Sequence, residues 1–120
     1  MLVAVSSTGV TLDSPMDPRF GRAAYFIVAD TETMEYSAVD NAGNRSGSGA
    51  GIAAAQSVAN RSVTAVITGN VGPNATEVLQ AAKIGIFKGE PGTARENILH
   101  FTRGELAAIE SAAGKRRGRP

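Results

Sequence analysis

The chain of 120 residues carries twelve basic and eleven acidic side chains, one histidine and no cysteine. This length fits a single domain that can bury roughly two-thirds of its unfolded surface and fold without covalent staples. The absence of cysteine excludes disulfides, thiolate-bound zinc, thiolate-bound iron–sulfur clusters and cysteine nucleophiles.

The charges are unevenly distributed. Four basic residues lie within the last six positions, and residues 1–114 carry a net charge of −3. We expect one domain over 1–112 and a basic, disordered tail over 113–120, with no nucleic-acid binding apart from that tail. No apolar run approaches the ~20 residues of a membrane span, and Met1 leads into a strand pattern rather than a signal peptide. A cytoplasmic protein without a membrane partner is therefore expected.

The first part of the chain predicts three strands. Residues 2–5 are a short apolar run, which is typical of a strand buried on both faces. A long loop precedes a second strand over 25–29, and the alternating pattern over 34–39 predicts a third strand with one wetter face. The long first connection and the short second one favour an antiparallel meander.

Helices and strands alternate in the rest of the chain. A glycine- and serine-rich loop over 41–51 precedes a small-residue helix over 52–60, whose buried stripe should contain Ile52, Ala55 and Ala59. The remaining expected elements are a strand over 63–67, a helix over 73–83, a strand over 84–87 and helices over 94–100 and 103–112.

The last two helices are predicted from capping boxes, Thr93 with Glu96 and Thr102 with Glu105. The whole order, β-β-β-α-β-α-β-α, predicts an α/β fold with a five-stranded mixed sheet and flanking helices. Crossovers through helices make the third, fourth and fifth strands candidates for a parallel set.

One edge of this sheet should hold the carboxyl ends of the first, third, fourth and fifth strands. Ligands of open α/β sheets bind outside such ends, so we expect a binding site at this edge. The loops that leave it cover residues 7–22, 41–51, 68–74 and 88–93.

The stretch Thr68–Ala75 joins a buried strand to a helix. Gly69 and Gly72 should give the backbone conformations closed to other residues and let a ligand approach. Pro73 suits the first helical position, and Asn74 with Glu77 offers a second way to cap the same start. A helix start reached in this way is a natural place for an anion, although a tight turn without a ligand is the alternative.

The first loop adds two arginines. Arg19 and Arg22 flank Phe20 and can together hold an anionic ligand. The alternative is that Phe20 packs in the core while the arginines pair with Asp13 and Asp17.

The other loops do not predict an enzyme. Gly47, Gly49 and Gly51 match a phosphate loop poorly because no lysine follows them, and their composition favours a flexible flap over a ligand. Ser6 has no histidine placed to activate it, and no paired carboxylates are evident.

Three motifs, Asp17–Arg22, Gly47–Gly51 and Thr68–Ala75, resemble those of the dinitrogenase iron–molybdenum cofactor biosynthesis family, which includes NifX, NafY and the carboxy-terminal part of NifB. The resemblance covers residues 1 to about 110. It implies a ribonuclease-H-like sheet and a non-catalytic carrier of an iron–sulfur or iron–molybdenum cofactor precursor, or a related anionic metallocluster, that works with cofactor-assembly proteins. The alternative is an adaptor or regulatory module that binds a protein or nucleotide partner in redox-enzyme maturation.

Nitrogenase members often have a histidine where this chain has Arg19. Without cysteine, a cluster would be held from outside by arginines and backbone N–H groups. No catalytic or metal-ligating residue is expected, and the oligomeric state is open. The expected cofactor-binding residues are Arg19, Phe20, Gly21, Arg22, Gly47, Gly49, Gly51, Gly69, Asn70, Gly72 and Asn74.

Overall fold

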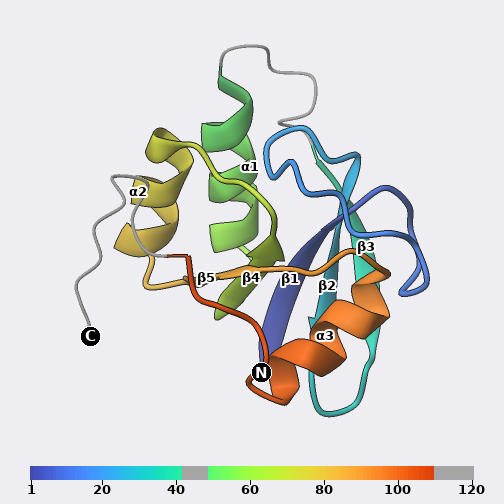
Figure 1. The fold of residues 1–120 in the computed structure, drawn as a ribbon. Helices are drawn as coiled ribbons and strands as arrows, with labels where there is room; N and C mark the ends of the chain where they lie inside the picture. The colour runs from blue at the N-terminus through green and yellow to red at the C-terminus, as the bar shows by residue number, and fades with distance from the viewer. Residues whose placement is uncertain (42–48, 110–120) are drawn as a thin grey trace.

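The computed structural model describes residues 1–41 and 49–109 (Figure 1). Gly47 and the expected tail over 113–120 lie outside these ranges. No helix within them has the length and apolar character needed to cross a membrane. The elements are β1 (Leu2–Ser7), β2 (Tyr25–Asp30), β3 (Tyr36–Asp40), α1 (Ala50–Ala59), β4 (Ala65–Thr68), α2 (Pro73–Ala81), β5 (Gly85–Lys88) and α3 (Ala94–Thr102).

The five strands form one mixed sheet in the order β3-β2-β1-β4-β5. The pairs β1–β2 and β2–β3 are antiparallel, whereas β1–β4 and β4–β5 are parallel. The predicted meander, the α/β class and the parallel pairing of the fourth and fifth strands are confirmed. The third strand, which was expected beside the fourth in a parallel set, pairs instead with β2, and β1 takes its place beside β4. Because β2 alone runs the other way, the carboxyl ends of β1, β3, β4 and β5 share one edge of the sheet.

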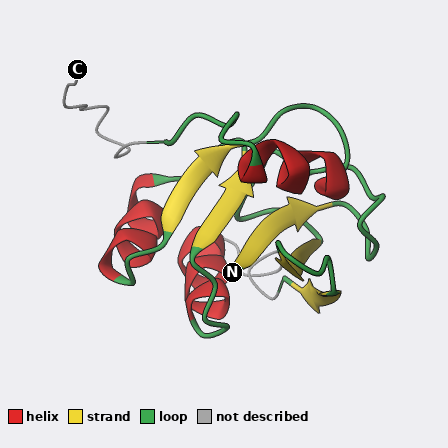
Figure 2. Ribbon diagram, turned by 90° about the horizontal axis from the view of Figure 1, so that it is seen from below, coloured by secondary structure: helices red, strands yellow, loops and turns green. Residues whose placement is uncertain are grey.

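Two hydrophobic cores lie on the two faces of the sheet. Figure 2 shows α1 and α2 on one face and α3 on the other. β1 passes between both cores and is buried on both faces, as its sequence predicts. Among the largest buried side chains are Phe20, Phe26, Val58 and Leu79 in the core below α1 and α2, and Val5, Ile27, Ile67 and Ile98 in the core below α3.

The buried stripe of α1 differs from the predicted one. Its buried residues are Ala50, Ala54, Ala55 and Val58, whereas Ile52 is only partly buried. The helix packs against α2 as well as the sheet, since a Cβ placed on Gly51 would lie 3.4 Å from Cβ of Ala75. Because α1 packs against both the sheet and α2, its buried residues differ from those that packing against the sheet alone would select.

The helix predicted over 103–112 is wrong. α3 begins with the expected capping box between Thr93 and Glu96 and ends at Thr102. Arg103 is its C-cap, and Gly104 then takes a left-handed conformation (φ +73°). The chain then runs along β5, where the N–H of Lys88 donates to the carbonyl of Ala107 (2.8 Å). Non-local pairing with β5 thus replaces the helix that the local pattern favours.

Candidate functional site

Two loops that are far apart in the sequence meet at the shared carboxyl edge. The carbonyl of Pro18 accepts hydrogen bonds from the N–H groups of Gly69 (3.1 Å) and Asn70 (2.7 Å). The N–H of Phe20 in turn donates to the carbonyl of Asn70 (3.2 Å). The first loop and the turn after β4 therefore form one backbone-bonded unit, and we call residues 16–20 with 69–72 the paired turns.

Glycine is required where the paired turns meet. A Cβ on Gly69 would lie 2.6 Å from Cβ and 2.8 Å from the carbonyl oxygen of Pro18, distances that are too short for any side chain. A Cβ on Gly21 would lie 3.1 Å from the backbone of Gly51 in α1, so a side chain there would require a small shift of that backbone.

The expectation of a special conformation at Gly69 and Gly72 is wrong. Neither is among the described residues with positive φ, and Gly72 has φ −70°. Gly72 is the N-cap of α2, and no side-chain hydrogen bond caps this helix start. The cap expected from Asn74 with Glu77 is therefore also wrong. A Cβ on Gly72 or on Gly49, the N-cap of α1, would meet no atom of the described residues within 4 Å. The part of the chain that the structure describes therefore leaves space beside both helix starts.

The side chains of the first loop follow the core-packing alternative in part. Phe20 is 1% exposed, and its ring centroid lies 5.1 Å from that of Phe26, so only its backbone reaches the edge. Arg19 pairs with Asp17, as that alternative expects, but Asp13 pairs with Arg95 of α3. Arg22 lies on the surface of the same loop.

The pair of Asp17 and Arg19 is two-pronged. Nε and Nη2 of Arg19 donate to the two carboxylate oxygens of Asp17 at 3.1 and 3.0 Å, and the backbone N–H of Arg19 donates to Oδ1 at 2.9 Å. Burial alone would raise the pKa of Asp17, but the hydrogen bonds and the charge of Arg19 outweigh it and hold this pKa below its ordinary value. The charge of Arg19 is thus partly balanced before any ligand arrives.

Acid should weaken the fold through Asp17. Because the folded-state pKa of this carboxyl is lowered, its contribution is complete above the unfolded value of about 3.9 and disappears as the pH falls through the folded value. We expect Asp17→Asn to melt below the wild type at pH 7 and the two melting temperatures to converge as the pH falls through the lowered folded-state pKa of Asp17. Asp13→Asn, which alters an exposed ion pair, is the control and should change little. A difference in melting temperature between wild type and Asp17→Asn that stays constant at every pH would contradict the attribution of the acid sensitivity to Asp17.

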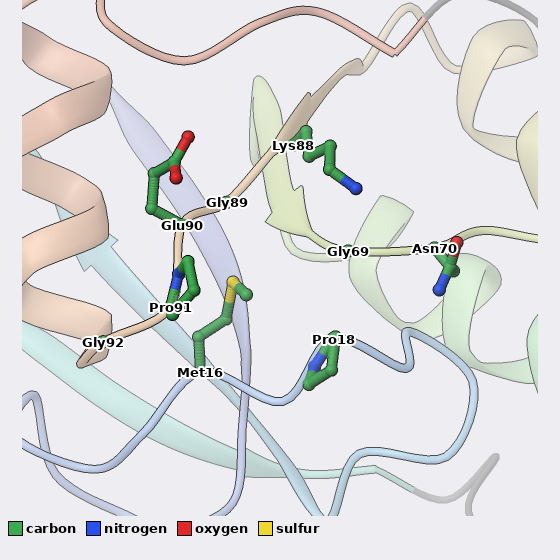
Figure 3. A pocket seen from close by; sticks show the side chains of 9 residues that line it. All are labelled: Met16, Pro18, Gly69, Asn70, Lys88, Gly89, Glu90, Pro91 and Gly92. Atoms are coloured by element: carbon green, nitrogen blue, oxygen red, sulfur yellow. The ribbon is translucent and has the colours of Figure 1, made fainter.

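The main cavity at this edge has a volume of about 460 Å³ and lies between the paired turns and the segment after β5 (Figure 3). The Lys88 side chain extends toward the Gly69–Asn70 turn, whereas the Glu90 carboxylate points away from Met16 and Pro18. The lining residues are Met16, Pro18, Gly69, Asn70, Lys88, Gly89, Glu90, Pro91 and Gly92.

Of these residues, the sequence-based assignment named only Gly69 and Asn70. The sequence predicts the loop over 88–93 at this edge. A lysine directly after the predicted strand over 84–87 is the signal that could have identified Lys88 as a lining residue. A second hollow of about 170 Å³ lies between the starts of α1 and α2. Gly51, Gly72 and Asn74 from the predicted set line it. The other described members of the set, which are Arg19, Phe20, Gly21, Arg22 and Gly49, line neither of these two hollows.

The wall formed by residues 89–92 is held in place from α3. The buried Asn97 accepts a hydrogen bond from the N–H of Glu90 (2.7 Å) and donates to the carbonyls of Glu90 (2.9 Å) and Thr93 (3.0 Å). Gly89 is also confined, because its Cβ would lie 2.8 Å from Oδ1 of Asn97. The backbone that carries Glu90 and Pro91 into the cavity is therefore fixed by one buried amide.

The charged and amide side chains that line this cavity are the amine of Lys88, the amide of Asn70 and the carboxylate of Glu90. The N–H groups of Gly69, Asn70 and Glu90 already donate within the protein. In the described ranges no cluster of three or more histidine, aspartate or glutamate side chains could hold a metal ion. The histidine of the chain, His100, contacts Glu105 through Nδ1 (2.7 Å) near the end of α3. This arrangement can hold an anion through its outer atoms.

Comparisons with known proteins agree with this architecture. The orange protein from Desulfovibrio gigas, solved in its apo form, is 40% identical, with a TM-score of 0.88 over 92% of this chain and 93% of that one. A candidate NifB protein from Thermotoga is 37% identical, with a TM-score of 0.82 over 98% of each chain. An uncharacterized protein of Methanocaldococcus jannaschii is 30% identical over 98 residues, which cover 79% of this chain and 83% of that protein.

The family model described as dinitrogenase iron-molybdenum cofactor matches residues 1–104. This range contains every described strand and helix, the paired turns and the main cavity. The chain belongs to the dinitrogenase iron–molybdenum cofactor family.

Proposed function

We propose that this protein binds and carries an anionic metal–sulfur cluster, such as an iron–sulfur or iron–molybdenum cofactor precursor, without turning it over. The observation that carries the proposal is the cavity of about 460 Å³ where Lys88 faces the Gly69–Asn70 turn. Its volume falls in the range typical of small-molecule sites. Family membership supports a role connected with this cofactor, and the 40% identical orange protein is described in an apo form, a term for a protein without its bound group.

The cavity offers contacts suited to the outside of such a cluster. Sulfide-bridged clusters present anionic sulfur atoms, which accept hydrogen bonds from ammonium and amide groups. Lys88 supplies a cation on the exposed end of β5, and Asn70 supplies an exposed side-chain amide. Since the Glu90 carboxylate points away from Met16 and Pro18, a guest can sit against the turn without meeting that charge at close range.

Binding of this kind suits a carrier. The chain has no cysteine, so cluster iron keeps ligands that come from elsewhere, and the protein contacts only the periphery. A few charge-assisted hydrogen bonds give reversible binding, with a dissociation constant of roughly 10–100 µM. A guest held so loosely can be passed to a partner protein.

The test is anaerobic titration of the purified protein with a synthetic tetranuclear iron–sulfur cluster anion that bears small thiolate ligands. Comigration on gel filtration and the visible absorbance of the cluster report binding. We expect Lys88→Gln to weaken binding about fivefold, because a lost contact to an exposed charge costs about 1 kcal/mol. Lys83→Gln, which removes the same charge at the opposite end of β5, should bind like the wild type.

Equal affinities for the two lysine variants would refute the assignment of the cavity. No binding by the wild type at 100 µM would refute the carrier proposal itself. Arg19→Ala and Arg22→Ala test the first loop. We expect Arg19→Ala to reduce the affinity less than Lys88→Gln does, because Asp17 already balances the charge of Arg19. Thermal stabilisation by ATP or phosphate, without any by the cluster, would favour a nucleotide-binding regulatory module instead.

A further inference from the structure

The main cavity contains one positive and one negative side chain that do not pair with each other. Lys88 and Glu90 both line it, and both are exposed. Within residues 1–41 and 49–109 neither side chain makes a hydrogen bond or an ion pair. Figure 3 shows the two side chains diverging, with the Lys88 amine extended toward the turn after β4 and the Glu90 carboxylate pointing in a different direction. Both charges can therefore act on a guest in the cavity.

The backbone that carries the Glu90 carboxylate is fixed on both sides. The N–H and the carbonyl of Glu90 bond to the buried amide of Asn97 at 2.7 and 2.9 Å. The preceding residue, Gly89, donates its N–H to the carbonyl of Thr68 (2.9 Å), and the ring of the following Pro91 restricts φ. The fold thus holds a negative charge at the wall of a cavity that otherwise suits an anion.

A carboxylate in this position opposes the binding of an anion. A guest seated against the turn after β4 lies beside the Lys88 amine and farther from the Glu90 carboxylate, so attraction exceeds repulsion. Both interactions grow in proportion to the negative charge of the guest. The carboxylate therefore lowers the affinity for a highly charged guest more than the affinity for a weakly charged one, and the amine has the opposite effect.

From this arrangement we propose that Glu90 determines specificity for the charge of the guest: it offsets Lys88, so that the cavity binds a cluster with similar affinity in two states that differ by one electron. The inference rests on the proposed function and concerns the same site. Without Glu90, a cluster would be held more tightly after it gained an electron, and its release would depend on reoxidation. With Glu90 in place, the protein can pass on its guest in either state.

The test uses the synthetic tetranuclear cluster with small thiolate ligands in its dianionic form and in the trianionic form that dithionite produces by adding one electron. The two forms differ in charge and hardly in size. In anaerobic titrations at low salt, the wild type should bind both within about twofold. We expect Glu90→Gln to shift the ratio of affinities about threefold toward the trianion, and Lys88→Gln to shift it about threefold toward the dianion.

The reduction potential of the bound cluster is a second readout. A threefold change in the ratio of the two affinities corresponds to a change of about 30 mV in this potential, because a tenfold change corresponds to about 59 mV for one electron. Voltammetry should give a higher potential for the cluster bound to Glu90→Gln than to the wild type, and a lower one for Lys88→Gln. Both shifts should shrink in about 0.5 M salt, which screens exposed charges.

Glu32→Gln is the matched control, because it removes the same charge from the exposed turn between β2 and β3, at the opposite edge of the sheet. Its affinity ratio and cluster potential should equal those of the wild type. An unchanged ratio in Glu90→Gln, or an equal shift in Glu32→Gln, would overturn the role of Glu90 and leave the carrier proposal standing. Failure of the wild type to bind either form of the cluster would overturn both.

Discussion

Replacing Gly69 by alanine should destabilise the fold by about 2 kcal/mol, because the added methyl must displace backbone. The new Cβ would lie 2.6–2.9 Å from three atoms of Pro18, whose carbonyl also accepts two hydrogen bonds from the turn after β4. Moving Pro18 away would therefore lengthen both bonds as well. Urea unfolding of the purified variant measures the loss.

Gly72→Ala is the matched control, three residues along the same turn. Within residues 1–41 and 49–109 its Cβ would meet nothing closer than 4 Å, and φ is −70°, which alanine adopts without strain. Its stability should stay within about 0.5 kcal/mol of the wild type or rise slightly, since alanine lowers the entropy of the unfolded chain. Similar losses at both positions would show that Gly69 is not held against Pro18.

Asn97→Ala should have a larger effect, about 3 kcal/mol, which corresponds to a fall in melting temperature of about 10–20 °C. The side chain is fully buried and makes three hydrogen bonds to the backbone of Glu90 and Thr93. Its removal leaves polar groups without partners and a small void below α3. Differential scanning calorimetry gives the melting temperature directly.

Asn60→Ala makes the same chemical change at an exposed position and should shift the melting temperature little. Because Asn97 fixes the cavity wall, cluster binding by Asn97→Ala should also weaken at a temperature where the variant is folded. A variant that melts like the wild type would mean that the loop after β5 is held by contacts other than this amide.

These two residues show where the candidate site gets its rigidity. Gly69 joins the first loop to the turn after β4, and Asn97 ties the loop after β5 to α3. The cavity lies between the two fixed segments. A guest that meets such walls loses less affinity to ordering the protein, which helps a site whose individual contacts are weak.

Much of the secondary structure was determined by local sequence. The apolar runs located all five strands, and Thr93 with Glu96 set the start of α3, because strand burial and helix capping depend on residues close together in the chain. The order of elements also gave the mixed sheet and the shared carboxyl edge. The three motifs were sufficient to indicate the family.

The composition of the site was decided by tertiary structure. The sequence left open whether Phe20 faced a ligand or the core, and only its contact with Phe26 answers that question. Lys88, Met16 and Pro91 were missed because a cavity wall depends on which loops become neighbours, and that follows from strand order and from bonds such as Pro18 to Asn70. Local sequence patterns reflect only interactions between residues that are close together in the chain, and long-range pairing can override them. It does so where the chain after Gly104 pairs with β5 instead of forming a helix.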